Sequence, residues 1–417
     1  MSTKSITNEL LLVAIFGICS WGCTLSSGNS GGNGGATSAG GTVGGATSTG
    51  GTAGSSSSNG GAVGGATGNG GAGGDTVGAG GGTSAGGQTG SGGSTVTFDP
   101  TKLPCDIYQD DGGPCVAAHS TVRLLRSAYN GPLYQIKKTD GTTQDIGVLS
   151  NGFAKSADQD SFCGTDACTI SIIYDQSGQG NDLTKAPPGG NKTTPGNEAK
   201  AKALPVTIGG NPVYGVHVVA GVGYRNNSAK GTVTGDNPQT MYMIAGGSYY
   251  NGGCCFDYGN AETNSRDNGE GTMEAVYFGT CTIWGKGADN GPWVMGDLEN
   301  GLWAGNISPY NDNKSLLSYT YVTGMVKGDV TASGTQGHWA IKEGNAQSGP
   351  LSKPFDGVRP NSRYIPMRKE GAIILGTGGD NSNSDQGNFF EGIMTARYSS
   401  DAADDAVQAN IVSVYGQ

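Results

Sequence analysis

The sequence contains little charge and very little histidine. Only 14% of its 417 residues are charged, and 34 acidic residues outnumber 24 basic ones, which gives a formal net charge of −10. Proteins that bind nucleic acid concentrate lysine and arginine on one face, so this balance indicates no nucleic-acid partner. The three histidines, His119, His217 and His338, are too scattered for a histidine-based metal motif. We therefore expect neither a bound metal nor another cofactor.

Signature motifs of other protein classes are also missing. The chain after residue 103 contains no GxSxG sequence, so nothing indicates an α/β-hydrolase. The loop Gly376–Asn383 and the nearby Asp385 offer oxygen ligands, but they lack the spacing of an EF-hand, so they are weak evidence for calcium. GxGxxG-like matches in the glycine-rich N-terminal part are framed by no predicted strand or helix, so they indicate no nucleotide site.

Residues 1–23 are predicted to be an export signal. Lys4 supplies a weakly positive start, and Leu10–Ile18 is an apolar segment too short to span a bilayer as a stable helix. Gly22 directly precedes Cys23, as in bacterial lipoprotein signals. Two outcomes stay open, namely lipidation of Cys23 with attachment to a membrane, or ordinary cleavage and release. Either outcome predicts an exported protein, extracellular or on the cell surface.

Residues 24–102 are predicted to be a disordered linker. Ser26–Thr95 is built from Gly, Ser, Thr and Ala, with no aromatic residue and Asp75 as its single charge. Such a segment cannot bury enough apolar surface to offset the entropy lost on ordering. Random-coil scaling gives it a mean reach of roughly 45 Å.

Residues 103–417 are predicted to form one all-β domain, because aromatic residues, cysteines and alternating apolar residues begin together near Leu103. Clusters of Gly, Asn, Asp and Pro separate the alternating segments, as turns require. The predicted strands are Thr169–Tyr174, Thr240–Ala245, Met273–Phe278, Leu317–Val322, Gly337–Lys342, Gly371–Leu375 and Phe389–Tyr398. One convincing helix follows a Ser400 cap, with Val407 and Ile411 on one face. This pattern favours a β-sandwich or jelly roll with long loops and one C-terminal helix.

Two carboxylates stand close together in the segment Gly291–Trp303. Alternation along a β-strand would place Asp297 and Glu299 on the same face. A rigidly held carboxylate with a second one nearby suits the nucleophile of a glycosidase. Asn300 follows and can hydrogen-bond a sugar hydroxyl. The alternative is an exposed strand edge with solvated acids.

Three more acids compete for catalytic roles. Asp380 lies on a loop after a predicted strand, where backbone amides are unpaired, so it is a candidate general acid/base; the alternative is an ordinary turn aspartate. Glu274 and Glu391 each lie between apolar residues on a predicted strand. The residues alone do not decide between these two and Glu299.

The nine cysteines indicate disulfide bonds in an exported protein. Cys105 with Cys115, and Cys163 with Cys168, bracket short segments that a disulfide can close. A bond between the neighbours Cys254 and Cys255 would make a rigid, flat platform for the C–H face of a sugar ring. The alternatives are two buried thiols, or pairing of these cysteines elsewhere. These pairings leave Cys281 outside any bond.

Several long motifs resemble one family of glycoside hydrolases. They are CDIYQDDGGPCVAAHSTVRLL, IIYDQSGQGNDLTKAPPGG, GYRNN, CCFDYGNAET, MEAVYFG, GPWVMGDLEN and KEGAIILGTGGDNSN. In this order they resemble the catalytic domain of family 54 α-L-arabinofuranosidases, from about Cys105 to the C-terminus. The resemblance implies a concanavalin-like β-sandwich and hydrolysis with retention of anomeric configuration. It does not extend to that family's C-terminal β-trefoil arabinose-binding domain, because the sequence stops at Gln417.

The resemblance also implies roles for individual residues. Glu299 matches the nucleophile and Asp380 the acid/base, so the resemblance selects Glu299 over the rival glutamates. Gly301 occupies a sugar-contact position where the family often has a second asparagine. The other implied substrate-binding groups are Asp297, Asn300, the Gly379 backbone, Trp284 and the Cys254–Cys255 disulfide.

We therefore predict an exported, retaining, exo-acting α-L-arabinofuranosidase. Its substrates would be arabinose-containing polysaccharides or oligosaccharides, such as arabinoxylan and arabinan of plant cell walls. The alternative is a non-catalytic, lectin-like sandwich on the cell surface, which would have no need of both Glu299 and Asp380.

Overall fold

The computed structural model describes residues 98–417, except 284, 311 and 331–335. The predicted export signal with Cys23, most of the predicted linker, and Trp284 lie outside the described residues. The domain boundaries drawn from the sequence therefore stay predictions.

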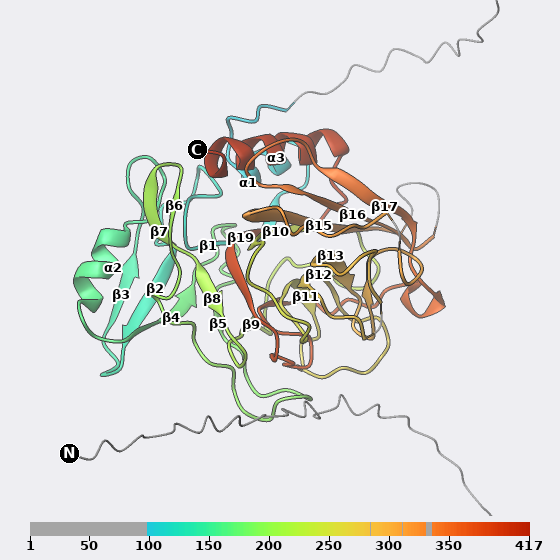
Figure 1. Cartoon of the computed structure of the whole chain (residues 1–417), viewed down its shortest axis with the longest axis horizontal. Coiled ribbons are helices and arrows are strands. Elements are labelled where there is room, and N and C mark those ends of the chain that lie inside the picture. Colours follow the sequence, from blue (N-terminus) through green and yellow to red (C-terminus); the bar gives the residue numbers. More distant parts are fainter. Residues whose placement is uncertain (1–97, 284, 311, 331–335) are drawn as a thin grey trace, which may run out of the picture. The chain divides into compact units, whose positions relative to one another are not determined.

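Two antiparallel sheets form the described part of the chain (Figure 1). The seven-stranded sheet has the order β1 (Cys115–Ser120), β19 (Gly387–Thr395), β10 (Gln239–Gly246), β15 (Tyr321–Gly328), β16 (His338–Asn345) and β17 (Ser352–Val358), with β8 (Val216–Val218) also paired to β19. The ten-stranded sheet has the order β14 (Leu302–Trp303), β13 (Trp293–Asp297), β12 (Glu274–Gly279), β11 (Asp257–Ala261), β18 (Ala372–Leu375), β9 (Tyr224–Asn226), β5 (Leu183–Lys185), β4 (Cys168–Ile173), β2 (Tyr134–Lys138) and β3 (Thr143–Ile146). A hairpin of β6 (Pro205–Ile208) and β7 (Asn211–Tyr214) stands apart. The predicted all-β sandwich is confirmed.

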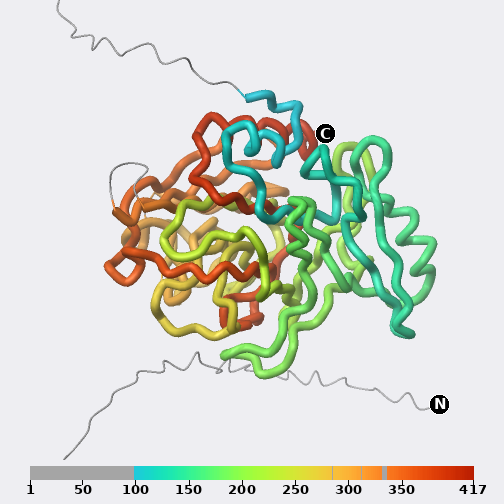
Figure 2. The backbone as a smooth tube through the Cα atoms, turned by 180° about the vertical axis from the view of Figure 1, so that it is seen from behind, coloured from blue at the N-terminus to red at the C-terminus, as the bar shows by residue number. Residues whose placement is uncertain are grey.

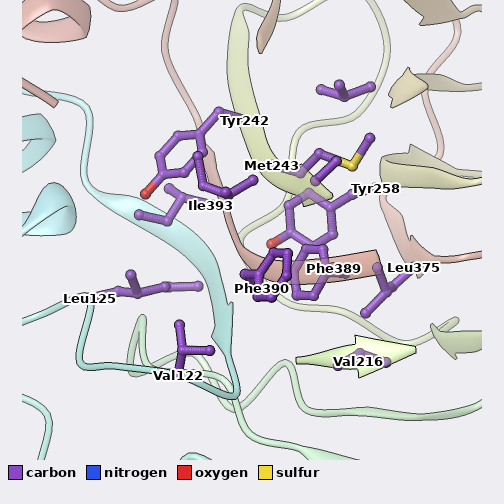
Figure 3. Packing of buried hydrophobic residues seen from close by; sticks show 14 of the residues in the cluster. Val122, Leu125, Val216, Tyr242, Met243, Tyr258, Leu375, Phe389, Phe390 and Ile393 are labelled. Carbon is purple, nitrogen blue, oxygen red and sulfur yellow. The ribbon is translucent and has the colours of Figure 1, made fainter. Parts of the chain in front are cut away.

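The main core lies between the two sheets. Tyr258 of β11 and Leu375 of β18 point from the ten-stranded sheet toward Phe389 of β19, and all three are buried (Figure 3). The ring centroids of Tyr258 and Phe389 are 5.4 Å apart. The other face of the seven-stranded sheet carries Tyr242 and Ile393, which are paired across β10 and β19 and are also buried. That second face is covered by the C-terminal helix.

The C-terminal helix α3 (Asp401–Tyr415) begins as the sequence predicts. The Ser400 side chain accepts the N–H of Ala403, and Val407 and Ile411 are buried. Figure 2 shows the helix beside the first described segment of the chain, in agreement with the hydrogen bonds from Asn410 Nδ2 to the carbonyls of Pro100 and Lys102. Among the described helices, none combines the length and apolarity needed to cross a membrane.

Other elements differ from the prediction. The helices α1 (Pro104–Asp110) and α2 (Ser156–Cys163) and the 3₁₀ turn η1 (Ser362–Tyr364) were not predicted, since elements this short show no apolar periodicity. The predicted strand Leu317–Val322 is wrong in position, because β15 starts only at Tyr321. The residues before it form a turn, in which the N–H of Tyr319 bonds to the carbonyl of Leu316.

Candidate functional site

The polar groups of the candidate site share one face of the ten-stranded sheet. The strand register places Arg225, Gly259 and Asp297 in one row across β9, β18, β11, β12 and β13. Side chains alternate between the two faces of a sheet, so this row lies opposite the face of Tyr258 and Val294, which pack into the core between the sheets. The site is therefore on the face that points away from the core.

Glu299 lies just beyond the end of β13. The prediction that the strand continues through this residue is wrong, because β13 ends at Asp297 and Glu299 has φ +82°. A tight turn replaces the strand. Asp297 Oδ1 accepts the N–H of Glu299 at 2.9 Å, and the N–H of Leu298 donates to the carbonyl of Gly301 at 2.9 Å. The turn thus fixes the backbone of Glu299 beside the carboxyl of Asp297 through this hydrogen bond.

The carboxylate of Glu299 accepts four backbone N–H groups from the connection between β11 and β12. Asn268 and Gly269 donate to Oε1 at 2.7 and 2.9 Å, and Gly271 and Thr272 donate to Oε2 at 2.7 and 3.0 Å. Burial opposes ionisation, but these donors stabilise the anion and lower the pKa of Glu299 below its usual value. The site therefore holds Glu299 as a carboxylate at neutral pH.

Asp297 forms a buried acid pair with Asp257 of β11. Both side chains are buried, and each raises or modifies the pKa of the other. Burial and the charge of Asp297 raise the pKa of Asp257 well above its usual range. Burial also raises the pKa of Asp297, to about 8. Both shifts favour the neutral carboxyl, so the pair adds less negative charge beside Glu299 than two ionised acids would.

Three disulfide bonds join the pairs expected from the sequence, Cys105–Cys115, Cys163–Cys168 and Cys254–Cys255. Cys281 is buried and lies outside these bonds. A carboxyl oxygen of Asp297 and the two sulfurs of Cys254–Cys255 lie within 4.8 Å of one another. The sulfurs are bonded to each other and provide no thiolate, so this donor set does not suit a metal. The disulfide instead forms an apolar surface beside Asp297.

Asp380 reaches the same region from the loop after β18. Its Oδ1 accepts the N–H of Ser382 at 2.9 Å, and its side chain is partly exposed. The Ser382 hydroxyl in turn lies 3.8 Å and 3.9 Å from the sulfurs of Cys254 and Cys255. The charge of Asp380 contributes to the raised pKa of Asp297. The structure thus brings Asp297, Glu299, Asp380 and the disulfide together.

The remaining predicted sugar contacts differ in what they offer. The amide of Asn300 lies between Asp267 Oδ2, at 3.1 Å, and Arg363 Nη1, at 3.3 Å, in the orientation that lets it donate to the first and accept from the second. Gly301 has no space for a side chain, because a Cβ there would meet the indole Nε1 of Trp303 at 1.9 Å. A contact from position 301 must therefore come from the backbone.

Four charged residues near Glu299 were not predicted from the sequence to be part of the site. Asp257 and Glu262 lie within the motif CCFDYGNAET, and Arg225 lies within GYRNN, but nothing local marks them. Burial together with the charge of Glu299 raises the pKa of Asp267 to about 6. Asp257, Glu262 and Asp267 lie close together in the sequence, but Arg225 and Glu299 are each about 30 or more residues away, and the fold brings them beside this segment.

The rival acids Glu274 and Glu391 have structural partners instead. Glu274 is fully buried, with Oε1 3.0 Å from Arg359 Nη2 and Oε2 3.3 Å from Lys369 Nζ. Burial opposes ionisation, but Lys369 and Arg359 outweigh it and lower the pKa of Glu274 to about 2. Glu391 pairs with Arg123 at 2.7 Å. Neither carboxylate faces Glu299.

Replacing Glu274 by glutamine should destabilise the protein. The variant keeps the size of the side chain but removes the counter-charge of the buried Lys369 and leaves Arg359 with Asp236 alone, which costs about 3 kcal/mol of unfolding free energy. Urea denaturation would measure this loss. Glu270→Gln, at an exposed position, is the matched control and should change little. An unchanged unfolding free energy in Glu274→Gln would contradict the structural role.

Stability should also fall as the pH rises above neutral. Burial raises the pKa of Glu262, Asp297 and Glu343 to about 8 in the folded state, against about 4 in the unfolded chain. Their contribution to stability is complete below the unfolded value and is lost as the pH rises through the folded value. The lowered pKa of His119 acts in the opposite direction only below about 6.5.

The melting temperature is therefore expected to drop by about 5 °C or more between pH 6.5 and 8.5. Differential scanning fluorimetry across this range would measure the drop. Glu343→Gln, outside the site, removes one ionising group and should flatten the curve. A melting temperature that stays level or rises would show that these acids are not buried in the protonated form.

Comparisons with known proteins identify the family of the chain. The family model described as "Alpha-L-arabinofuranosidase B, catalytic" matches residues 104–416. A probable α-L-arabinofuranosidase B of Aspergillus terreus is 56% identical over 317 residues, covering 74% of this chain and 62% of the relative. An α-L-arabinofuranosidase of Hypocrea jecorina is 56% identical over 316 residues, with the same coverage. The chain thus spans less than two thirds of the length of these curated relatives.

Solved structures of this group are similar too. An arabinofuranosidase complexed with arabinofuranosyl-α-1,2-xylobiose has 51% identity and a TM-score of 0.71, over 75% of this chain and 65% of the other. A GH54 α-L-arabinofuranosidase soaked with a cyclic sulfate inhibitor gives the same values. The family match, these relatives and the shared fold lead to one conclusion: the chain belongs to the catalytic-domain family of α-L-arabinofuranosidase B, glycoside hydrolase family 54.

Proposed function

We propose that this protein is a retaining, exo-acting α-L-arabinofuranosidase that releases arabinofuranose from plant cell-wall polysaccharides such as arabinoxylan and arabinan. The observation that carries the proposal is the ionised Glu299, held by four backbone N–H groups beside Asp297 and the Asp380 loop. Family membership supports it, as does the arabinofuranosyl-xylobiose bound in the similar enzyme.

In the proposed mechanism Glu299 attacks the anomeric carbon while Asp380 protonates the departing glycosidic oxygen. A covalent arabinofuranosyl-enzyme forms, and Asp380 then takes a proton from water as the water displaces Glu299. Each displacement inverts the anomeric centre, so the product keeps the starting configuration. The lowered pKa of Glu299 supports its role as nucleophile, because only the carboxylate attacks.

Sugar binding is assigned to groups around the nucleophile. The carboxyl of Asp297 and the amide of Asn300 would bind hydroxyl groups, and the backbone of Gly379 and Gly301 would add polar contacts. The Cys254–Cys255 disulfide would pack against the apolar face of the ring. Trp284 is expected to form another wall, and it lies outside the described residues.

The three disulfides support an exported protein, since such bonds persist in oxidising compartments. Lipidation of Cys23, with attachment to a membrane, remains a prediction from the Gly22–Cys23 sequence. Mass spectrometry of the mature N-terminus would test it. A mature chain that starts beyond Cys23 without lipid would refute the anchor and leave export intact.

The activity can be tested with the purified protein and 4-nitrophenyl α-L-arabinofuranoside. Proton NMR of the first product should show the α-anomer before mutarotation, and arabinoxylan should release arabinose monomers. Binding of the sugar without release of nitrophenolate would favour the lectin-like alternative. A β-anomer as first product would overturn the double-displacement mechanism.

A further inference from the structure

Arg225 is a buried arginine whose hydrogen bonds go to backbone carbonyls and to one amide side chain, while the nearest carboxylate oxygen of Glu262 is 3.9 Å away. Its Nη1 donates to the carbonyl of Gly379 at 2.6 Å and to that of Gly378 at 3.4 Å. Its Nη2 donates to the backbone carbonyl of Glu262, and its Nε donates to Asn227 Oδ1. All three nitrogens of the guanidinium group are therefore engaged. They join the chain after β11 to the two residues that precede Asp380.

The carboxyl of Glu262 packs against the same glycine. A Cβ added to Gly379 would meet Glu262 Oε2 at 1.9 Å. The φ of Gly379 lies outside the left-handed region, so backbone strain does not require glycine there. The contact with Glu262 is therefore what excludes a side chain. Glu262 is fully buried, and Oε2 has no hydrogen-bond partner among the described residues. The nearest cationic group is Arg225 Nη2, 3.9 Å from Oε2. Glu262 therefore forms a wall behind Gly379.

The charges around Glu262 favour a neutral carboxyl. Burial raises its pKa to about 8, the charges of Glu299 and Asp297 act in the same direction, and Arg225 opposes them. Thr272 Oγ1, on the loop that holds Glu299, lies 3.5 Å from Oε1. A protonated Glu262 fills the space between the two halves of the site without adding another negative charge.

We propose that Arg225 and Glu262 are positioning residues that set the place of the Gly379–Asp380 peptide, and so aim the Asp380 carboxyl at the leaving oxygen. This inference rests on the proposed function of Asp380 as acid/base. Arg225 holds the peptide from its carbonyl side and Glu262 limits its movement at the Cα of Gly379. A displacement of about 1 Å in a catalytic group can cost roughly 100-fold in rate.

The first test compares two substrates. Arg225→Met removes the donors but keeps the apolar stem, and kcat and KM are measured on phenyl and 4-nitrophenyl α-L-arabinofuranoside. If Asp380 is misplaced, it donates its proton less efficiently to the leaving oxygen. The kcat should then fall by about 100-fold on the phenyl substrate and by less than about 10-fold on the nitrophenyl substrate, because nitrophenolate needs little protonation. Arg225→Lys should recover part of the loss. The exposed Arg397→Met is the matched control, because the ion pair of Arg397 is with Asp111, away from the Glu299 loop. Equal losses on both substrates would overturn the proposal.

A second test holds even if Arg225→Met does not fold. Gly379→Ala should push the peptide away from Glu262 and produce the same dependence on the leaving group. Adding Glu262→Ala removes the atoms that the new Cβ meets, so the double variant should regain at least about 10-fold activity on the phenyl substrate. No recovery would refute the contact as a positioning device. Wild-type protein that cleaves neither substrate would instead refute the proposed function.

Discussion

Replacing Glu299 by glutamine is expected to reduce turnover of arabinofuranosides by at least about 1,000-fold while arabinose still binds. The amide cannot form the covalent intermediate. Its NH₂ group must also face two backbone N–H donors, either those of Asn268 and Gly269 or those of Gly271 and Thr272. Steady-state kinetics measure the loss, and isothermal titration with arabinose measures binding.

Replacing Glu299 by alanine removes the nucleophile without placing an NH₂ group against backbone N–H donors. Glu299→Ala leaves space for azide, which can attack the anomeric carbon while nitrophenolate departs from the 4-nitrophenyl substrate. The single displacement should give the β-configured arabinofuranosyl azide, identified by NMR. Glu270→Gln, on the same connection but exposed, should keep near-normal activity. Near-normal turnover by Glu299→Gln would refute the assignment, and Asp267 would then be the first acid to test.

Replacing Asp380 by asparagine is expected to give a loss that depends on the leaving group. The asparagine oxygen can still accept the N–H of Ser382, so the loop keeps its shape. Without a general acid, kcat/KM on phenyl α-L-arabinofuranoside should fall by about 100- to 10,000-fold, and on a dinitrophenyl substrate by less than about 10-fold. A series of aryl arabinofuranosides compared with wild type would measure this difference.

Azide tests the second step of the same variant. It needs no general base, so it should accelerate Asp380→Asn on activated substrates and yield the α-configured azide, the opposite anomer to that from Glu299→Ala. Asp405→Asn, an exposed aspartate on α3, is the control and should match wild type. A uniform loss across all leaving groups, without azide rescue, would show that Asp380 is not the acid/base.

The sequence predicted the long strands better than the short ones. β10 and β12 carry alternating or continuous apolar residues between clear turn signals, so their patterns are readable. β5, β8 and β9 have only three residues each, too few to show any period. They form because neighbouring strands complete their hydrogen bonds, which is information that lies elsewhere in the chain.

For the candidate site, spacing predicted that Asp297 and Glu299 lie close together, but it did not predict what surrounds them. Asp297 and Glu299 are two residues apart, so their proximity is a local property, although the turn at Glu299 was missed. Glu274 and Glu391 also lie between apolar residues, and only their distant partners Arg359 and Arg123 show that they are structural. The backbone N–H groups that lower the pKa of Glu299 come from a separate loop, the connection between β11 and β12. No local sequence pattern predicts that this loop contacts Glu299.

For protein engineering, the contiguous segment Cys254–Thr272 matters most. It carries the Cys254–Cys255 disulfide, Asp257, Glu262 and all four backbone amides that hold Glu299. Transplanting it intact between homologues would move these groups as one cassette, whereas a crossover point inside it would separate parts that depend on one another. Libraries that aim at new substrates should diversify loops that touch Asp380 from outside, such as the one with Asn191, whose N–H binds the Asp380 carbonyl.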